Sequence, residues 1–425
     1  MIARGQFHIK FSDLIRSIFK LVFSDFNQTD KVSRFRNELK NHFMANDIEL
    51  FSSCRIAFDQ FLKSKNIEKG SEVLLCPVTI PDMINALIIN GLKPVFVEMN
   101  LSNHSFCIED LKSKISSKTC MILNTNLSGL NNLSSEVYSI AKNENLLYVD
   151  DISQAPVENY FEHDFAAEYA VVSMSIGKTI TSLVGGVLIS KKESLRIDPL
   201  ILSKGKRSYF IRQIFENLKI DLLTSSTVYR FFTRHILFLL SRISPSTYLS
   251  IHLTNTISKY SERDIFFDDI PVLRKSFPNE LYFPFSNWMA WLGQRTLKNW
   301  GNVLRKRSIN RKVFLDNCSS KLKSMIAQNF IDEDYFPTRV PIYTHDVERL
   351  SLYGISKGLD MGTYGLNNCS EELVFDKFSV DLPVSRYIKT NCVFLNLSEK
   401  TSTKDLLSSI YILNDYFEGE LNEDT

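Results

Sequence analysis

The sequence lacks the features that mark secreted, metal-binding and membrane-spanning proteins. Its seven cysteines include no C-x-x-C pair, which favours reduced thiols in a cytosolic protein over a disulfide framework. The seven histidines are dispersed without any H-x-x-x-H pattern, so we expect no structural metal. No apolar run approaches the roughly 20 residues that a membrane span requires. We also find no signal peptide pattern, and these absences predict a cytoplasmic protein.

Strong charge of one sign is also missing. The net charge of +2 gives the chain no global attraction to nucleic acid, so we expect no nucleic-acid partner. The apolar share of 44% and the charged share of 23% are those of ordinary globular proteins. At 425 residues the chain exceeds the usual size of a single core, which predicts about two to three domains.

One segment is unusually apolar and aromatic. It spans 228–253 and reads "VYRFFTRHILFLLSRISPSTYLSIHL", with Arg230, Arg234 and Arg242 interleaved among apolar residues. We interpret it as a buried helix pair with cationic ends. The alternative is a helix that lies on a membrane surface and makes a peripheral contact.

The hydrophobic pattern divides the chain into three parts. Residues 1–50 show apolar residues three and four apart and are predicted to be helical. Residues 51–280 are predicted to form a large α/β domain with a helical apolar insertion at about 191–280. Residues 281–425 are predicted to form a long connecting helix, about 286–325, and a small C-terminal α/β domain.

The large domain is expected to contain a mainly parallel sheet. Its candidate strands carry no polar alternation and are separated by helix-period stretches, which is typical of a parallel sheet covered on both faces. These strands are 72–77, 94–99, 120–125, 146–150, 170–174 and 186–190.

Polar residues gather where these strands end. One strand runs into Asp150 and Asp151, and another runs through Ser173 towards Lys178. In parallel sheets ligands collect beyond the carboxyl ends of the strands. A lysine can form a Schiff base with an aldehyde, and a carboxylate can keep a pyridine nitrogen protonated. Either aspartate is possible, because neighbouring side chains of a strand point to opposite faces.

A further polar group precedes the first strand. The segment "FSSCRIAF" places Ser53, Cys54 and Arg55 at the start of an expected helix, where backbone N–H groups can hold a phosphate. A lysine, a carboxylate and an anion site together are what a protein supplies to pyridoxal phosphate chemistry.

The order of these motifs resembles the DegT/DnrJ/EryC1/StrS family of pyridoxal-phosphate-dependent sugar aminotransferases, which have the fold-type I architecture. "NENLLYVDDISQAP" is similar to the family's strand ending in E-D-A-A-Q, and "SMSIGKTITSLVGGVLIS" to its S-F-x-x-x-K segment. "KGSEVLLCPVTIPDMINALIINGLKPVFVEMN" resembles its G-D-E-V-I-V-P segment and the following G-x-x-P-V-F-V-D. The resemblance runs from about residue 52 to the C-terminal helix.

The resemblance implies a role for each matching residue. Lys178 would bind the cofactor covalently and then shuttle a proton, and Asp151 rather than Asp150 would pair with the pyridine nitrogen. Gln154 would contact the phenolic oxygen of the ring. The phosphate would be bound by four further residues, namely Ser173, Ser53, Cys54 and Arg55.

The chain departs from the family pattern at several positions. The phosphate loop S-G-T-A-A reads "SCRIA" here, and the aromatic residue that stacks on the cofactor is replaced near Ile80. The H-L-Y-G segment reads Asn126 to Gly129, and no N-x-R motif is recognisable in "LYFPFSNWMAWLG". These changes affect the expected sugar pocket more than the expected cofactor site.

The resemblance therefore predicts an aminotransferase with pyridoxal 5'-phosphate as cofactor and no metal. It implies a homodimer that moves an amino group from an amino acid, typically glutamate, to a keto group of a nucleotide-linked sugar. The product would enter polysaccharide or lipopolysaccharide synthesis. One alternative is a different keto substrate or a lyase or dehydratase outcome. Another is a non-catalytic homologue that serves as a binding partner in glycan assembly.

Overall fold

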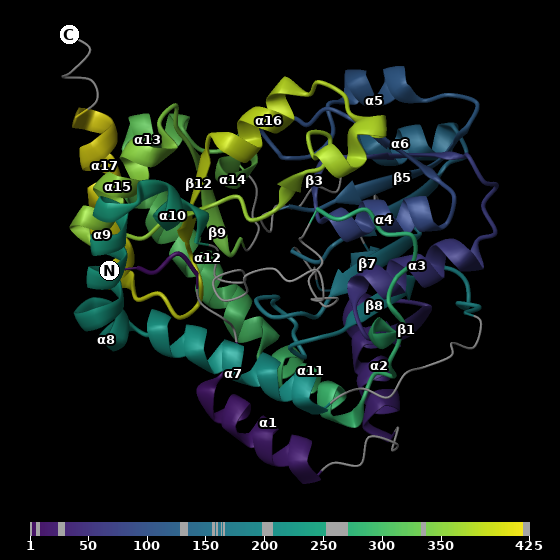
Figure 1. The fold of residues 1–425 in the computed structure, drawn as a ribbon, viewed down its shortest axis with the longest axis horizontal. Helices are drawn as coiled ribbons and strands as arrows, with labels where there is room; N and C mark the ends of the chain where they lie inside the picture. The colour runs from purple at the N-terminus through teal and green to yellow at the C-terminus, as the bar shows by residue number, and fades with distance from the viewer. Residues whose placement is uncertain are drawn as a thin grey trace.

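A seven-stranded mixed sheet forms the centre of the larger part of the computed structural model (Figure 1). The structure describes residues 2–5, 9–23, 30–127, 135–154, 158, 160–162, 164, 166–197, 207–251, 271–332 and 337–419. The strands of the sheet are β1 (Asp47–Phe51), β2 (Glu72–Leu75), β4 (Lys93–Phe96), β5 (Thr119–Thr125), β6 (Leu147–Asp151), β7 (Tyr169–Ser173) and β8 (Gly186–Ser190).

The spatial order of the strands is β1-β8-β7-β6-β5-β2-β4. The five strands from β7 to β4 run parallel, whereas β8 is antiparallel to both β7 and β1. The carboxyl ends of β5, β6 and β7 therefore meet at one edge, as predicted for the candidate site. All six predicted strands are confirmed.

Both faces of the sheet are covered, which explains why its central strands are mainly apolar. Helices α3 (Cys54–Ser64) and α4 (Pro81–Ile89) cover one face. The other face is covered by α2 (Asp30–Phe43), α5 (Ile108–Lys114), α6 (Ser135–Asn143) and α11 (Asn287–Lys298). Neighbouring residues of β7 enter different cores, Val171 on the α3 side and Val172 on the α2 side.

Two expectations about helices were wrong. The segment 1–50 contains α1 (Phe11–Phe23) and α2, but it ends in the edge strand β1, which pairs with β8. Arg36 of α2 holds this strand through Asp47 and Glu49, at 2.9 Å and 2.8 Å. The single long helix expected over 286–325 is instead three helices, α11, α12 (Trp300–Asn317) and α13 (Ser320–Ser324). The last of these begins after Ser319, whose Oγ accepts from the Leu322 N–H.

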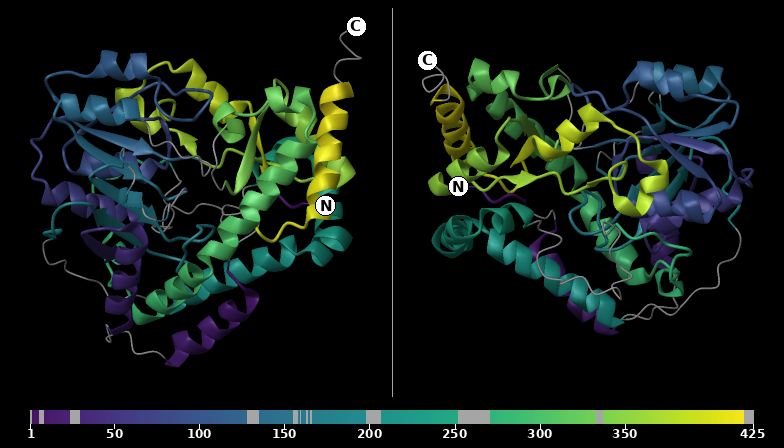
Figure 2. Two further views of the ribbon diagram at one scale, coloured as in Figure 1. Left: turned by 180° about the vertical axis from the view of Figure 1, so that it is seen from behind. Right: turned by 45° about the horizontal axis from the view of Figure 1, so that its top comes forward.

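A smaller α/β unit follows, as expected. Its sheet has the order β10-β12-β9, with β9 at Arg339–Tyr343, β10 at Gly362–Thr363 and β12 at Cys392–Asn396. Helices α15 (Val347–Lys357) and α17 (Thr403–Gly419) pack on it. Figure 2 shows this unit beside the large sheet, with α12 running between the two. The predicted domain boundaries themselves stay a prediction.

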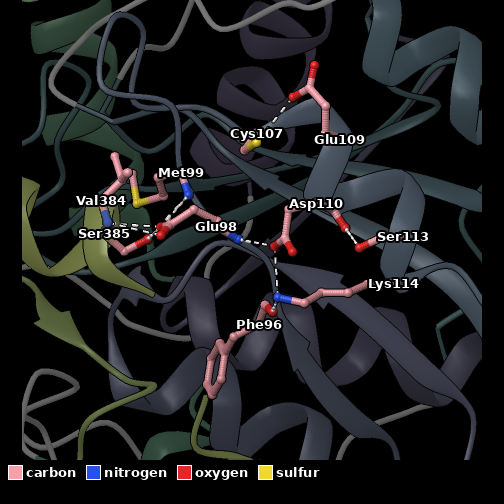
Figure 3. A network of polar contacts seen from close by, with 10 residues as sticks. All are labelled: Phe96, Glu98, Met99, Cys107, Glu109, Asp110, Ser113, Lys114, Val384 and Ser385. Carbon is pink, nitrogen blue, oxygen red and sulfur yellow. Dashed lines mark hydrogen bonds and ion pairs between the residues drawn. The ribbon is translucent and has the colours of Figure 1, made fainter. Parts of the chain in front are cut away.

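Glu98 joins the two parts of the chain (Figure 3). Its carboxylate lies at the N-terminus of α16 (Pro383–Thr390) and accepts from the backbone N–H groups of Val384 and Ser385, at 2.9 Å and 2.8 Å. A carboxylate at a helix N-terminus is stabilised by unsatisfied N–H groups and the helix dipole. Asp110 accepts from the Glu98 N–H at 2.6 Å and so fixes the segment that carries this carboxylate.

The helical segment after the sheet differs from its expected role. It comprises α7 (Arg207–Thr224), α8 (Ser226–Val228), a π-helical turn (Tyr229–Thr233), α9 (Arg234–Ile243) and α10 (Pro245–Ser250). The predicted buried helix pair is wrong, because Ile236, Leu239 and Ile243 of α9 are exposed. The end of the 228–253 segment lies outside the described residues. Among the described helices, none is both long and apolar enough to cross a bilayer.

Candidate active site

The two aspartates at the end of β6 have separate environments. Asp150 lies opposite Asn124 of β5, whose amide donates to its Oδ1 at 2.7 Å, and Tyr160 donates to its other oxygen. Burial raises the pKa of Asp150 to about 6, although these hydrogen bonds act in the opposite direction. Asp151 follows in the same strand and so points to the other face. Asp150 therefore belongs to a buried structural network, which favours Asp151 as the site carboxylate.

Ser153 links the predicted site residues, and the sequence analysis gave it no role. Its N–H donates to Oδ1 of Asp151 at 2.9 Å, and its Oγ accepts from the Ser173 N–H at 2.8 Å. The same Oγ lies 3.7 Å from Sγ of Cys54. Through its backbone N–H and its buried hydroxyl, Ser153 thus connects the ends of β6 and β7 with the start of α3. Its place two residues after Asp151 in the "DDISQ" motif is the only sequence signal that pointed to it.

The start of α3 has the character of an anion site. Ser53 is the N-cap residue of this helix, in extended conformation, but its side chain makes no capping hydrogen bond. Its Oγ is buried and has no hydrogen-bond partner among the residues that the structure describes. A buried hydroxyl without a partner is unfavourable in the absence of a ligand. Beside it, Ser173 Oγ lies 2.9 Å from Ser175 Oγ, at the end of β7.

Glycine is required where β8 passes the start of α3. Ser53 and Gly185 form an isolated parallel bridge. A Cβ atom on Gly186 would lie 2.3 Å from the Cys54 nitrogen and 2.3 Å from the Ser53 oxygen, both of them backbone atoms. Gly185 has a φ of +130°, which L side chains rarely adopt. The glycine pair after Lys178 therefore lets the sheet approach the helix N-terminus closely.

Lys178 lies half-buried in the loop between β7 and β8. The loop turns sharply at Gly177, with a φ of +84°, and the Lys178 N–H donates to the Ser175 carbonyl at 3.2 Å. Helices α11 and α12 hold the part of the loop that follows the lysine. Thr296 of α11 bonds both the N–H and the carbonyl of Thr181, at 3.1 Å and 3.0 Å.

A buried arginine is the second contact that sequence reasoning missed. Arg307 of α12 donates to Oγ1 of Thr179 at 3.1 Å, directly after Lys178. Its guanidinium also lies 3.8 Å from Glu399 of the smaller unit. Burial lowers the pKa of Arg307 to about 10, and the charge of Glu399 acts in the opposite direction. No sequence signal pairs these positions, because they are far apart in the chain.

Three predicted residues lie less directly at this site. Arg55 is buried and forms an ion pair with Asp82, a carboxylate that Arg274 also contacts at 2.6 Å. This geometry favours a structural role, and its expected phosphate contact stays a prediction. Ile80 is half-buried as the N-cap residue of α4, and Gln154 is half-buried after Ser153. Their contacts with a cofactor also stay predictions.

The positions of these site residues fit pyridoxal phosphate, the cofactor that the sequence analysis expected. Ser53 Oγ, Ser173 and the start of α3 would hold a phosphate, and Asp151 would hold a protonated ring nitrogen. Lys178 follows on the neighbouring strand exit and would provide the amine. Gly129 of the expected H-L-Y-G equivalent lies outside the described residues.

Comparison with known proteins supports the family resemblance. The model of the DegT/DnrJ/EryC1/StrS aminotransferase family matches residues 20–214, which confirms the predicted resemblance. The chain is 24% identical over 190 residues to GDP-perosamine synthase of Escherichia coli O157:H7, a match that covers 44% of this chain and 52% of that protein. The chain thus spans about half the length of this relative.

Solved structures confirm the predicted fold class. An aminotransferase from Psychrobacter cryohalolentis superposes with a TM-score of 0.69 at 15% identity, covering 98% of this chain and 99% of that one. A GDP-4-keto-6-deoxymannose-3-dehydratase with a trapped PLP-glutamate geminal diamine superposes with a TM-score of 0.65 at 14% identity, covering 97% of this chain and all (100%) of that one. At these identities the likeness establishes the fold.

Proposed function

We propose that the protein is a pyridoxal-phosphate-dependent aminotransferase that acts on a keto group of a nucleotide-linked sugar. The observation that carries the proposal is the convergence at Ser153, which joins Asp151, Ser173 and the start of α3 in one hydrogen-bonded group. The resemblance to sugar aminotransferases supports the substrate class.

When bound, the cofactor would act as an electron sink for the carbon that carries the amino group. The protein residues would orient it and handle protons. The start of α3, with Ser53 and Ser173, would fix the phosphate and so set the position of the ring. The Asp151 carboxylate would keep the ring nitrogen protonated, since an adjacent negative charge favours the protonated form.

Lys178 would have two tasks. Its Nζ would hold the cofactor until the amine of a substrate displaces it, and it would then carry a proton between substrate and cofactor. The hydrogen bonds between Thr296 and Thr181 and from Arg307 to Thr179 would restrict the loop and hold the amine in position.

The finer assignments belong to the same proposal. Glutamate is the proposed amino donor, and a surface polysaccharide or lipopolysaccharide is the proposed destination of the product. We also propose that the protein is located in the cytoplasm and forms a homodimer. A relative of 23% identity, a spore coat polysaccharide biosynthesis protein of Bacillus subtilis, supports the glycan pathway.

A half-reaction tests the proposal. The protein is loaded with pyridoxal phosphate and mixed with glutamate, and the absorption spectrum and the 2-oxoglutarate formed are followed. We expect one equivalent of 2-oxoglutarate per site and conversion to the pyridoxamine form. Lys178→Ala should abolish this conversion, whereas Lys192→Ala, at an exposed position after β8, should retain it. Failure to bind the cofactor would contradict the proposal, and binding without transfer would favour the lyase alternative.

A further inference from the structure

The surface of α9 and the π-helical turn before it is apolar where a surface helix is normally polar. Phe232, Ile236, Leu239 and Ile243 recur at helical spacing and lie on one side. Their side chains are exposed by 66%, 66%, 60% and 73%. The residue of α9 that is buried is the polar Ser241. The helix thus exposes large apolar side chains on its outer side.

Helix α7 continues this pattern. Phe215 and Leu222 are exposed by 58% and 57%, and α7 leads through α8 directly into the π-helical turn. Figure 1 shows α8 and α9 on the side of the molecule opposite to β1 and β8. Helix α9 packs with α15 of the smaller unit and with α10, and its Ile236, Leu239 and Ile243 stay exposed. Exposed apolar side chains at helical spacing on consecutive helices are typical of a binding surface.

The charged residues of α9 and of the π-helical turn have one sign, whereas Glu216 and Asp221 of α7 pair with Lys219 and Lys400. From Leu222 to Ile251 the chain contains no aspartate or glutamate. Arg230, His235 and Arg242 are exposed beside the apolar residues. The guanidinium of Arg230 lies 3.5 Å from Asp405, and that of Arg242 lies 5.3 Å from the centre of the Phe238 ring. The surface thus combines apolar side chains with arginines, and it is complementary to a partner that is apolar and anionic.

This charge pattern decides between two occupants. In a two-fold symmetric contact with a second copy, α9 would face itself and bring its arginines towards arginines, and this helix has no acidic residue to pair with them. A bilayer with anionic lipids offers acyl chains to the apolar residues and phosphates to the arginines at the same depth. Helices with an apolar side and a cationic side lie in such an interface.

We infer that the α7–α9 surface, formed by Phe215, Leu222, Phe232, Ile236, Leu239, Ile243 and the adjacent arginines, binds the surface of a membrane that contains anionic phospholipid. This inference is independent of the proposed function, because it uses none of the site residues.

Vesicle sedimentation of the full chain tests the inference. We expect the bound fraction to rise about tenfold when phosphatidylglycerol is added to phosphatidylcholine vesicles, and to fall again in high salt. Ile236→Ser/Leu239→Ser should abolish binding, and Arg242→Gln should weaken it about fivefold. These side chains are exposed, so the variants should fold. Leu373→Ser is the matched control, because Leu373 is 88% exposed on another element and should have no effect.

Three outcomes would overturn the inference. The first is no binding to either vesicle, and the second is equal binding of the double variant. The third is a change of oligomeric state in the double variant, measured by sedimentation velocity, without any binding to vesicles. That result would identify a second copy as the occupant.

Discussion

Arg307 donates a hydrogen bond to Oγ1 of Thr179 at 3.1 Å, and Thr179 directly follows the proposed catalytic lysine. The arginine is buried and lies 3.8 Å from Glu399. A charged side chain from α12 therefore holds the lysine loop and at the same time contacts the smaller unit. We regard Arg307 as a positioning residue.

Replacing Arg307 should reduce the rate more than the substrate affinity. Arg307→Met removes the hydrogen bond to Thr179, and we expect kcat to fall about 10- to 100-fold because a small displacement of Lys178 suffices. Thr179→Val should lower kcat by less than Arg307→Met does, because the charge of Arg307 stays in place next to Glu399. Arg305→Met, at an exposed position of α12, is the control. Equal kcat in Arg307→Met and the control would contradict the positioning role.

The close approach at Gly186 gives a second prediction. Gly186→Ala would place a Cβ atom 2.3 Å from backbone atoms of Ser53 and Cys54, so the start of α3 has to move. We expect the free energy of unfolding to fall by about 1–3 kcal/mol. The affinity for pyridoxal phosphate should weaken at least about tenfold. Gly301→Ala is the control, because its Cβ meets no atom within 4 Å and alanine favours the helix α12. Unchanged cofactor affinity in Gly186→Ala would count against the anion site.

The two neighbouring aspartates should respond differently to the same change. Asp150→Asn disrupts the hydrogen bonds with Asn124 and Tyr160, so it should destabilise the fold by about 1–3 kcal/mol and leave kcat of the folded protein nearly unchanged. Asp151→Asn should retain the fold but lower kcat at least about 100-fold, because the ring nitrogen loses its carboxylate. Denaturant titration and steady-state kinetics separate the two effects. A reversed pattern would assign the site to Asp150.

A half-buried histidine, His42, predicts a dependence of stability on pH. Burial lowers the pKa of His42 from 6.5 to about 4, so the folded state holds this imidazole neutral. The unfolded chain binds the extra proton first, and stability should therefore fall as the pH drops from about 6.5 towards 4.

His42→Phe isolates this effect. Its Nε2 has no hydrogen-bond partner among the described residues, and the ring packs edgewise on Phe43 and Trp300, so a phenyl ring should fit. Between pH 7.5 and pH 5 the variant should lose about 1–2 kcal/mol less stability than the unmodified protein, measured by urea titration. Equal losses of stability in the variant and the unmodified protein would show that His42 does not titrate as expected. His104, whose pKa burial lowers to about 3, would maintain the same trend in both proteins.

The sequence predicted the parts of the fold that local pattern determines. The strands from β5 to β8 are continuous apolar runs, and both faces of the sheet are indeed covered. Strand β1 was missed because "DIELF" is short and half polar, and it becomes a strand by pairing with β8. The interruption between α11 and α12 occurs at Asn299, which carries no strong helix-breaking signal.

The site was predictable only where it follows strand ends. The exits of β6 and β7 gave Ser173, Lys178 and the pair Asp150 and Asp151 from topology, and the family resemblance then selected Asp151. Ser153 and Arg307 act through contacts that only the tertiary structure creates. For α9 the sequence showed an apolar side, but it did not show that this side faces outward. Burial depends on which neighbours cover a helix, and here α15 covers the other side.

The most direct measurement of the central claim is the location of the covalent bond to the cofactor. The protein is incubated with pyridoxal phosphate, reduced with borohydride and digested, and the peptides are analysed by mass spectrometry. The account predicts one modified peptide that contains Lys178, and its loss in Lys178→Ala. Modification at exposed lysines such as Lys192 but not at Lys178, or no modification at all, would contradict it.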